Sequence, residues 1–179
     1  MAKLKDRYAN ALLEISEARD SLETDIEQSA LICTTLESAE IQAFLTHPHI
    51  STSEKQQFFQ NVFSDKLADH LMGFLYLMIR KSREALIVPA LREYMTRANR
   101  RLGKIEAKVV SAKPLKENQI ESIRLLLSKQ TNLEVDLKAV SDPDVIGGFY
   151  ILLDGYIFDG TVRSQLNNMR EQLKRGGFQ

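Results

Sequence analysis

The sequence predicts an α+β protein, with an N-terminal six-helix bundle over residues 1–103 and a small C-terminal α+β domain over residues 104–179. Apolar residues recur at helical spacing from Leu4 to Leu102. After Gly103 the period changes to the alternation that is typical of strands. The turn dipeptide Asp154-Gly155 lies between two short apolar runs, which indicates a β-hairpin.

Six N-terminal segments have helical periodicity and end near capping residues or helix breakers. The expected helices span residues 4–19, 22–38, 40–46, 52–63, 66–81 and 84–102. Ser21 is the expected N-cap of the second helix, and Ser51 with Glu54 matches a capping box before the fourth. Pro48 stops the third helix because proline has no backbone N–H and clashes with the preceding turn.

The first and fifth helices carry more apolar residues than one core-facing stripe needs. In the first helix, Leu4, Tyr8, Ala11, Leu12 and Ile15 form one stripe, and Ala9 and Leu13 add a second, narrower one. In the fifth helix, the stripe of Leu67, Leu71, Phe74, Leu75 and Met78 is extended by Met72, Tyr76, Leu77 and Ile79. Two interpretations remain open. Either the sixth helix buries the additional apolar side chains, or a partner covers a patch that includes Tyr76, Leu77 and Ile79.

The C-terminal segment alternates in the order strand, helix, strand and hairpin. Two alternating strands, residues 105–109 and 133–139, flank a helix with one apolar face, which predicts a parallel pair with a right-handed crossover. Residues 149–153 and 156–158 form the expected hairpin, and Asp159 or Thr161 caps a final helix. We expect that helix to cover the sheet with the apolar residues Val162, Leu166, Met169 and Leu173.

Composition restricts the class of protein. The 24 basic and 24 acidic residues cancel, but acids dominate residues 14–40 and bases dominate residues 80–104. These blocks belong either to helices that lie against each other or face charged partners, or to solvated faces without a partner. The most apolar run, residues 71–79, is too short to span a membrane. Cys33 is the only cysteine, so no internal disulfide can form, and the N-terminus has no targeting signal, which favours a bacterial-type cytoplasmic chain.

No motif predicts a catalytic, cofactor-binding or metal site. His47 and His49 lack a third ligand, and His70 is expected to be a partly exposed helix residue. Asp154 and Asp159 occupy turn positions, where aspartate bonds to the backbone. The Gly147-Gly148 pair lacks the lysine and hydroxyl residue of a phosphate-binding loop. The sequence therefore predicts binding surfaces rather than chemistry.

Three segments resemble the family of the delta subunit of F-type ATP synthases, which includes the oligomycin-sensitivity-conferring protein. They are Arg7-Tyr8-Ala9-Asn10-Ala11-Leu12, residues 107–115, and the C-terminal stretch with Asp142-Pro143, Val145-Ile146-Gly147-Gly148 and Asp159-Gly160-Thr161-Val162-Arg163 followed by Leu166. They occur in the family's order across nearly the whole chain. One position departs from the pattern, since Gly73 stands where the family often has asparagine.

The resemblance implies a non-catalytic stator protein without a cofactor. It would be present in one copy, peripherally at the cytoplasmic face of the bacterial inner membrane, and would link the catalytic head to the peripheral stalk. It implies that the N-terminal bundle holds the N-terminal helix of an alpha subunit and that the C-terminal domain contacts the end of the b-subunit dimer. The residues expected to contact the alpha subunit are Tyr8, Ala11, Leu12, Ile15, Gly73, Tyr76, Leu77 and Arg80. Those expected to contact the b subunits are Val162, Leu166, Met169 and Leu173.

A nucleic-acid-binding module that uses the basic run of residues 92–104 is the alternative function. That run lacks interleaved aromatic residues, and the chain as a whole is not basic. An enzyme is the class with the least support in the sequence.

Overall fold

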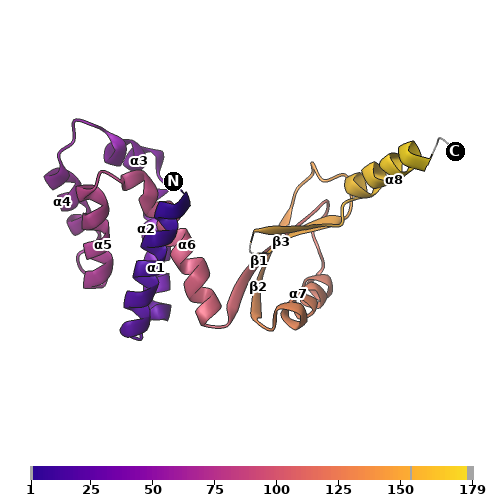
Figure 1. Ribbon diagram of the computed structural model, residues 1–179, viewed down its shortest axis with the longest axis horizontal. Coiled ribbons are helices and arrows are strands. Elements are labelled where there is room, and N and C mark those ends of the chain that lie inside the picture. The colour runs from indigo at the N-terminus through magenta and orange to yellow at the C-terminus, as the bar shows by residue number, and fades with distance from the viewer. Residues whose placement is uncertain (1, 154, 177–179) are drawn as a thin grey trace. The chain divides into compact units, whose positions relative to one another are not determined.

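A computed structural model describes residues 2–153 and 155–176. Over these residues the protein is α+β, with eight α-helices, one short 3-10 helix and four strands in one sheet (Figure 1). The chain divides into two compact units, residues 1–102 and 103–179. The predicted α+β class, with a small sheet in the C-terminal part, is confirmed.

The helical unit contains an α-helix in each of the six segments with helical periodicity. These are α1 (Ala2–Ala18), α2 (Leu22–Leu36), α3 (Ala39–Thr46), α4 (Thr52–Phe63), α5 (Asp69–Arg80) and α6 (Ile87–Arg101), with the 3-10 helix η1 (Glu84–Leu86) before α6. α5 begins later than predicted because the N–H groups of Lys66 and Leu67 still bond to the carbonyl of Phe63 at the end of α4. Pro89 lies in the first turn of α6, where a missing N–H costs no helical hydrogen bond.

The core of the helical unit forms where α1 and α2 pack against α6 and where α4 packs against α5. α1 contributes the narrower of its two predicted stripes, Ala9 and Leu13, together with Leu12 and the fully buried Ser16. Tyr94 of α6 is also fully buried, and its hydroxyl donates a hydrogen bond of 2.9 Å to Ser16 Oγ. Burial raises the pKa of Tyr94 to about 12, so this side chain is a neutral donor.

The two helix caps predicted in the helical unit have different outcomes. At α4 the capping box is confirmed, because Ser51 Oγ accepts from the N–H of Glu54 at 3.2 Å and Glu54 Oε2 accepts from the N–H of Ser51 at 2.9 Å. Ser21 directly precedes α2, but its hydroxyl makes no cap and donates instead to Asp25 Oδ2 at 2.7 Å. The prediction that Ser21 caps α2 by its side chain is therefore wrong, since the buried Asp25 takes the hydroxyl as a donor.

The C-terminal unit is built on a four-stranded sheet in the order β2-β1-β3-β4. Strands β1 (Lys104–Ser111) and β2 (Glu134–Ser141) are parallel and are joined by α7 (Glu117–Thr131), as the alternating pattern predicted. Strands β3 (Phe149–Leu153) and β4 (Tyr156–Asp159) form the antiparallel hairpin, in which Leu153 pairs with Tyr156. The loop is thus the expected two residues long. Gly155 has a φ of +82°, and Asp154 lies outside the described residues.

One face of the sheet carries the core of the C-terminal unit. Val109 and Val135 of the parallel strands and Ile151 of β3 are buried with Leu127 of α7. The last helix, α8 (Val162–Gly176), does not cover the sheet, so that prediction is wrong. Its apolar residues are instead 39% to 76% exposed. α7 supplies the helical side of this core, and α8 leaves the sheet from the end of the edge strand β4 (Figure 1).

Candidate partner-binding surfaces

The outward face of α5 carries the four residues that the sequence assigned to a partner. Gly73, Tyr76, Leu77 and Arg80 follow the helical spacing of one face, and the opposite face is buried. Gly73 and Arg80 are exposed, and Tyr76 and Leu77 are half-buried. Ile79, which was expected in the exposed patch, is 2% exposed and belongs to the core. Periodicity misplaced it because α5 is apolar over most of its circumference.

On α1 the predicted partner residues separate into two groups. Tyr8 is half-buried, Ala11 is exposed, and Ile15 is 40% exposed. Leu12 is only 2% exposed and packs in the core with Ala9 and Leu13. The structure therefore leaves Leu12 no surface to offer to a partner, whereas its three neighbours form an accessible strip beside the core-facing stripe.

Aromatic and cationic contacts join α1 to α5. The rings of Tyr8 and Phe74 meet edge to face, with centroids 6.2 Å apart and planes at 71°. The guanidinium of Arg83 donates a hydrogen bond to the Tyr8 hydroxyl and lies 5.8 Å from the centre of its ring. Beside this contact, a Cβ atom at Gly73 would meet nothing within 4 Å. We call Tyr8, Ala11, Ile15, Gly73 and Leu77 the α1/α5 surface.

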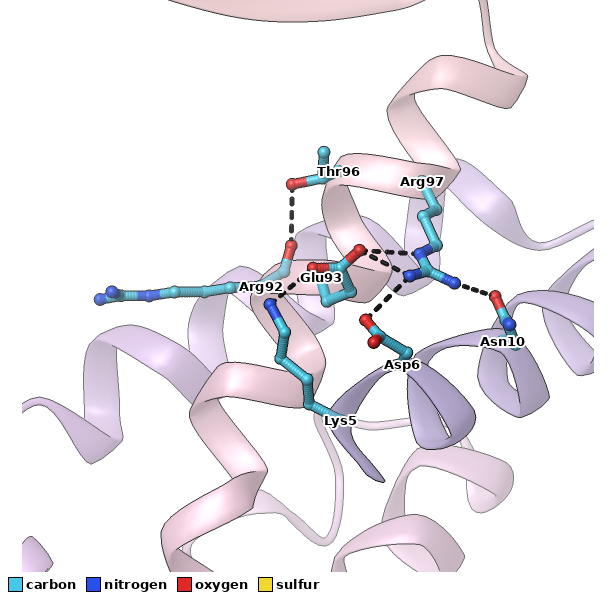
Figure 2. Close-up of polar contacts among 7 residues, drawn as sticks. All are labelled: Lys5, Asp6, Asn10, Arg92, Glu93, Thr96 and Arg97. Carbon is cyan, nitrogen blue, oxygen red and sulfur yellow. Dashed lines mark hydrogen bonds and ion pairs between the residues drawn. The ribbon is translucent and has the colours of Figure 1, made fainter. Parts of the chain in front are cut away.

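A polar network fixes α1 to α6 (Figure 2). Arg97 of α6 contacts Asp6 at 3.0 Å and Glu93 at 2.7 Å, and it also donates a hydrogen bond to Asn10. Glu93 in turn pairs with Lys5 at 2.9 Å. The hydrogen bond from Lys5 is the main reason that the pKa of Glu93 is lowered, with Arg97 adding to it. α6 thus holds α1 by residues other than those of the α1/α5 surface.

A buried polar pair fixes α5 to α2. His70 Nε2 lies 2.8 Å from Asp25 Oδ2, and the two side chains are 6% and 0% exposed. His70 is a partly exposed residue of α5, as expected, although its side chain is almost entirely buried. Sequence reasoning missed this pair because its members lie 45 positions apart and neither sits in a motif. Because His70 lies at the start of α5, the pair helps to fix which face of α5 points outward.

The basic run of residues 92–104 is largely engaged within the helical unit. Arg92 pairs with Glu37 at 2.9 Å, and Arg101 pairs with Glu17 at 3.1 Å. These contacts show that the acidic and basic blocks lie against each other, which was one of the two interpretations. Arg100 and Lys104 also have interaction partners. The run is therefore not a row of unpaired cations of the kind that binds phosphates.

The described ranges contain no cluster of three or more metal-ligating side chains. His47 Nδ1 accepts a hydrogen bond from the N–H of His49 at 3.3 Å, so the histidine loop closes on itself. Burial raises the pKa of Cys33 to about 11, which leaves its thiol protonated and unreactive at neutral pH. No helix among the described residues is long and apolar enough to cross a membrane.

The second predicted surface is the apolar face of α8. Val162, Leu166, Met169 and Leu173 are 39%, 58%, 58% and 76% exposed and follow one face of the helix. α7 adds Leu125 and Leu126, also more than half exposed, which sequence reasoning did not select. A signal for them existed, because three consecutive leucines cannot all face the same core.

Gly147, Thr161 and Asp159 fix the first turn of α8 by hydrogen bonds. The N–H of Val162 donates to the Gly147 carbonyl at 3.0 Å, and Thr161 Oγ1 caps the helix by accepting from the N–H of Ser164 at 3.2 Å. Asp159 accepts from the Ser164 hydroxyl at 2.6 Å and from the N–H of Thr161 at 2.8 Å, and these bonds lower its pKa. Asp159 is thus a backbone-bonding residue, as its turn position predicted.

Exposed apolar faces of this kind are typical of proteins that bind other proteins. Comparison with known proteins shows which kind. Residues 4–173 match the model of the family described as ATP synthase delta (OSCP) subunit. The chain belongs to this family.

Several bacterial proteins are similar in sequence to almost the whole length of this chain. The chain is 32% identical to an ATP synthase subunit delta of Clostridium perfringens, covering 96% of this chain and 97% of that one. It is 31% identical to that of Clostridium kluyveri, with 97% and 96% covered, and 30% identical to that of Protochlamydia amoebophila, with 93% of both covered.

The fold is also similar to a solved one. A chain in the cryo-EM structure of the Toxoplasma gondii mitochondrial ATP synthase hexamer superposes with a TM-score of 0.79, over 95% of this chain and 97% of that chain, at 14% identity.

As a member of this family, the chain is a peripheral-stalk, or stator, subunit of the F-type ATP synthase, a membrane-associated complex. The function predicted from the sequence resemblance is confirmed, and nucleic-acid binding receives no support.

Proposed function

We propose that this chain links the catalytic head of the synthase to its peripheral stalk without performing catalysis. In this proposal the α1/α5 surface, with Tyr76 and Arg80 on the same face of α5, binds the N-terminal helix of an alpha subunit. The exposed face of α8 contacts the end of the b-subunit dimer. One copy serves each complex, held peripherally at the cytoplasmic face of the bacterial inner membrane.

One observation supports the alpha-subunit site above all others. α5 buries one apolar face in the helical core, and its outward face still presents Leu77 beside an uncovered Gly73. A glycine whose Cβ position is open to solvent lets a second helix approach closely, and flanking larger side chains supply its anchors. The edge contact of Tyr8 with Phe74 gives this surface its second wall on α1.

Replacing Leu77 with glutamate tests the site. The variant is expected to keep its helical circular dichroism, because Leu77 is half-buried and lies outside the packed core cluster. Binding of an alpha-subunit N-terminal peptide should weaken by about 2 kcal/mol or more in calorimetry, as for a central anchor. Leu31→Glu on α2, where Leu31 is 41% exposed, is the matched control and should bind normally. Unchanged affinity of Leu77→Glu would remove this residue from the site, and its unfolding would assign Leu77 to the core.

We also propose that residues 1–103 and 104–179 are separate domains. α6 ends at Arg101 and β1 begins at Lys104, so only a short connection joins the two units. Limited proteolysis should cut near residues 100–104 and release a helical fragment that melts cooperatively. If a fragment of residues 1–104 were unfolded by circular dichroism, the boundary would be misplaced.

A further inference from the structure

The charges along the α1/α5 surface differ between its two ends. Arg83 follows α5 and contacts Tyr8 near the start of α1, while His70 at the start of α5 contacts Asp25, beyond the end of α1. The two helices are therefore antiparallel. At the Tyr8 end, α5 ends with Arg80 and is followed by Lys81, and the opposite end starts with Asp69. The surface thus has a basic end and an acidic end.

Two cations of the basic end, Arg80 and Lys81, have no side-chain partner among the residues that the structure describes. Arg80 and Lys81 are exposed, and among the described residues neither side chain forms an ion pair or a hydrogen bond. The α6 arginines Arg92 and Arg97 differ, because they pair with Glu37, directly after α2, and with Asp6 of α1. Two unpaired cations at the rim of an apolar strip create a positive potential that a partner can meet.

We propose that the helix bound at the α1/α5 surface carries an acidic segment over Arg80, Lys81 and Arg83, and that this charge match sets its direction. The inference rests on the proposed alpha-subunit site. Apolar contacts with Tyr8 and Leu77 are non-directional, so a guest helix could bind them in either orientation or shifted by a turn. Opposite charges at one end, and like charges in the reversed orientation, remove that ambiguity.

The test measures affinity for two peptides against salt concentration. The first is the N-terminal 25 residues of the alpha subunit from the same organism, and the second has every Asp and Glu replaced by Gln. The variant Arg80→Glu/Lys81→Glu should bind the first peptide at least about 10-fold more weakly than the unmodified protein at 20 mM NaCl. The deficit should shrink to about 2-fold at 500 mM, because salt screens exposed charges. The variant and the unmodified protein should bind the acid-free peptide equally.

Two further variants control the charge change and the fold. Arg170→Glu/Lys174→Glu makes the same charge change on α8 and should bind the first peptide normally. Arg80→Gln/Lys81→Gln removes the charges without reversing them, and it replaces the reversed variant if that variant loses its helical circular dichroism. Its loss of affinity for the first peptide, on a logarithmic scale, should be about half that of the reversed variant.

Two results would overturn the inference. One is equal binding of the first peptide by the reversed variant and the unmodified protein. The other is a deficit of the same size with the acid-free peptide. If the unmodified protein bound neither peptide, the proposed site itself would fail, and that result is distinct from binding that ignores charge.

Discussion

Replacing His70 with leucine should lower the free energy of unfolding of the helical unit by about 3 kcal/mol, the upper end of the cost of removing one partner from a buried hydrogen bond. His70 Nε2 and Ser21 Oγ are the donors to Asp25 Oδ2, at 2.8 Å and 2.7 Å. Asp25 Oδ1 is buried and has no hydrogen-bond partner among the described residues. The variant would therefore leave a carboxylate with one hydroxyl donor in a fully buried position. Urea unfolding followed by circular dichroism measures the loss.

A double-mutant cycle separates this pair from simple loss of packing. Asp25→Asn keeps the shape of the side chain and removes its charge, so His70→Leu should cost less in the Asp25→Asn background than in the native chain. A loss below about 1 kcal/mol for His70→Leu alone would contradict the role of His70 as a buried hydrogen-bond donor to Asp25.

Replacing Gly148 with alanine should destabilise the C-terminal unit by about 3 kcal/mol. Gly148 has a φ of +77°, which costs about 1–2 kcal/mol for a residue with a Cβ. Its Cβ would also lie 2.5 Å from the carbonyl oxygen of Gly160 and 3.1 Å from Thr161 Cα, and both are backbone atoms that cannot rotate away. The chain before α8 would have to move. Thermal unfolding of the isolated variant measures the cost.

Gly155→Ala is the matched control for Gly148→Ala. Gly155 has a φ of +82°, but a Cβ there would meet nothing within 4 Å. It should therefore lose only the conformational part, about 1–2 kcal/mol. Equal losses for the two variants would show that the close approach of Gly148 to Gly160 does not contribute.

Local signals predicted much of this fold. The strand pairing and the two-residue hairpin were predictable because alternation and the Asp154-Gly155 pair act over a few residues. The Ser51 capping box was predictable for the same reason. Ser21 was not, because its hydroxyl is used by Asp25, whose burial depends on α5 and the rest of the helical unit.

The candidate surfaces were less predictable than the elements that carry them. Leu12 was assigned to a partner, and Ile79 to a patch that a partner could cover, but both are core residues. A helix with more than one apolar stripe does not reveal which stripe faces inward. The expectation that α8 covers the sheet was wrong, because an amphipathic pattern shows that a helix has an apolar face but not what that face contacts. The Asp25 and His70 pair left no sequence signal at all.

The packing of α1 on α6 has a consequence for biosynthesis. Asp6 and Arg97, which the polar network joins, are 91 positions apart, and α6 is the last helix of its unit. At about 5–20 residues per second, the ribosome makes the partner of α1 on the order of 5 to 20 s after α1 itself. During that interval Leu12 and Leu13 have no α6 to pack against. The side of α1 that packs on α6 is therefore uncovered in the nascent chain, at the stage when chaperones bind exposed apolar segments.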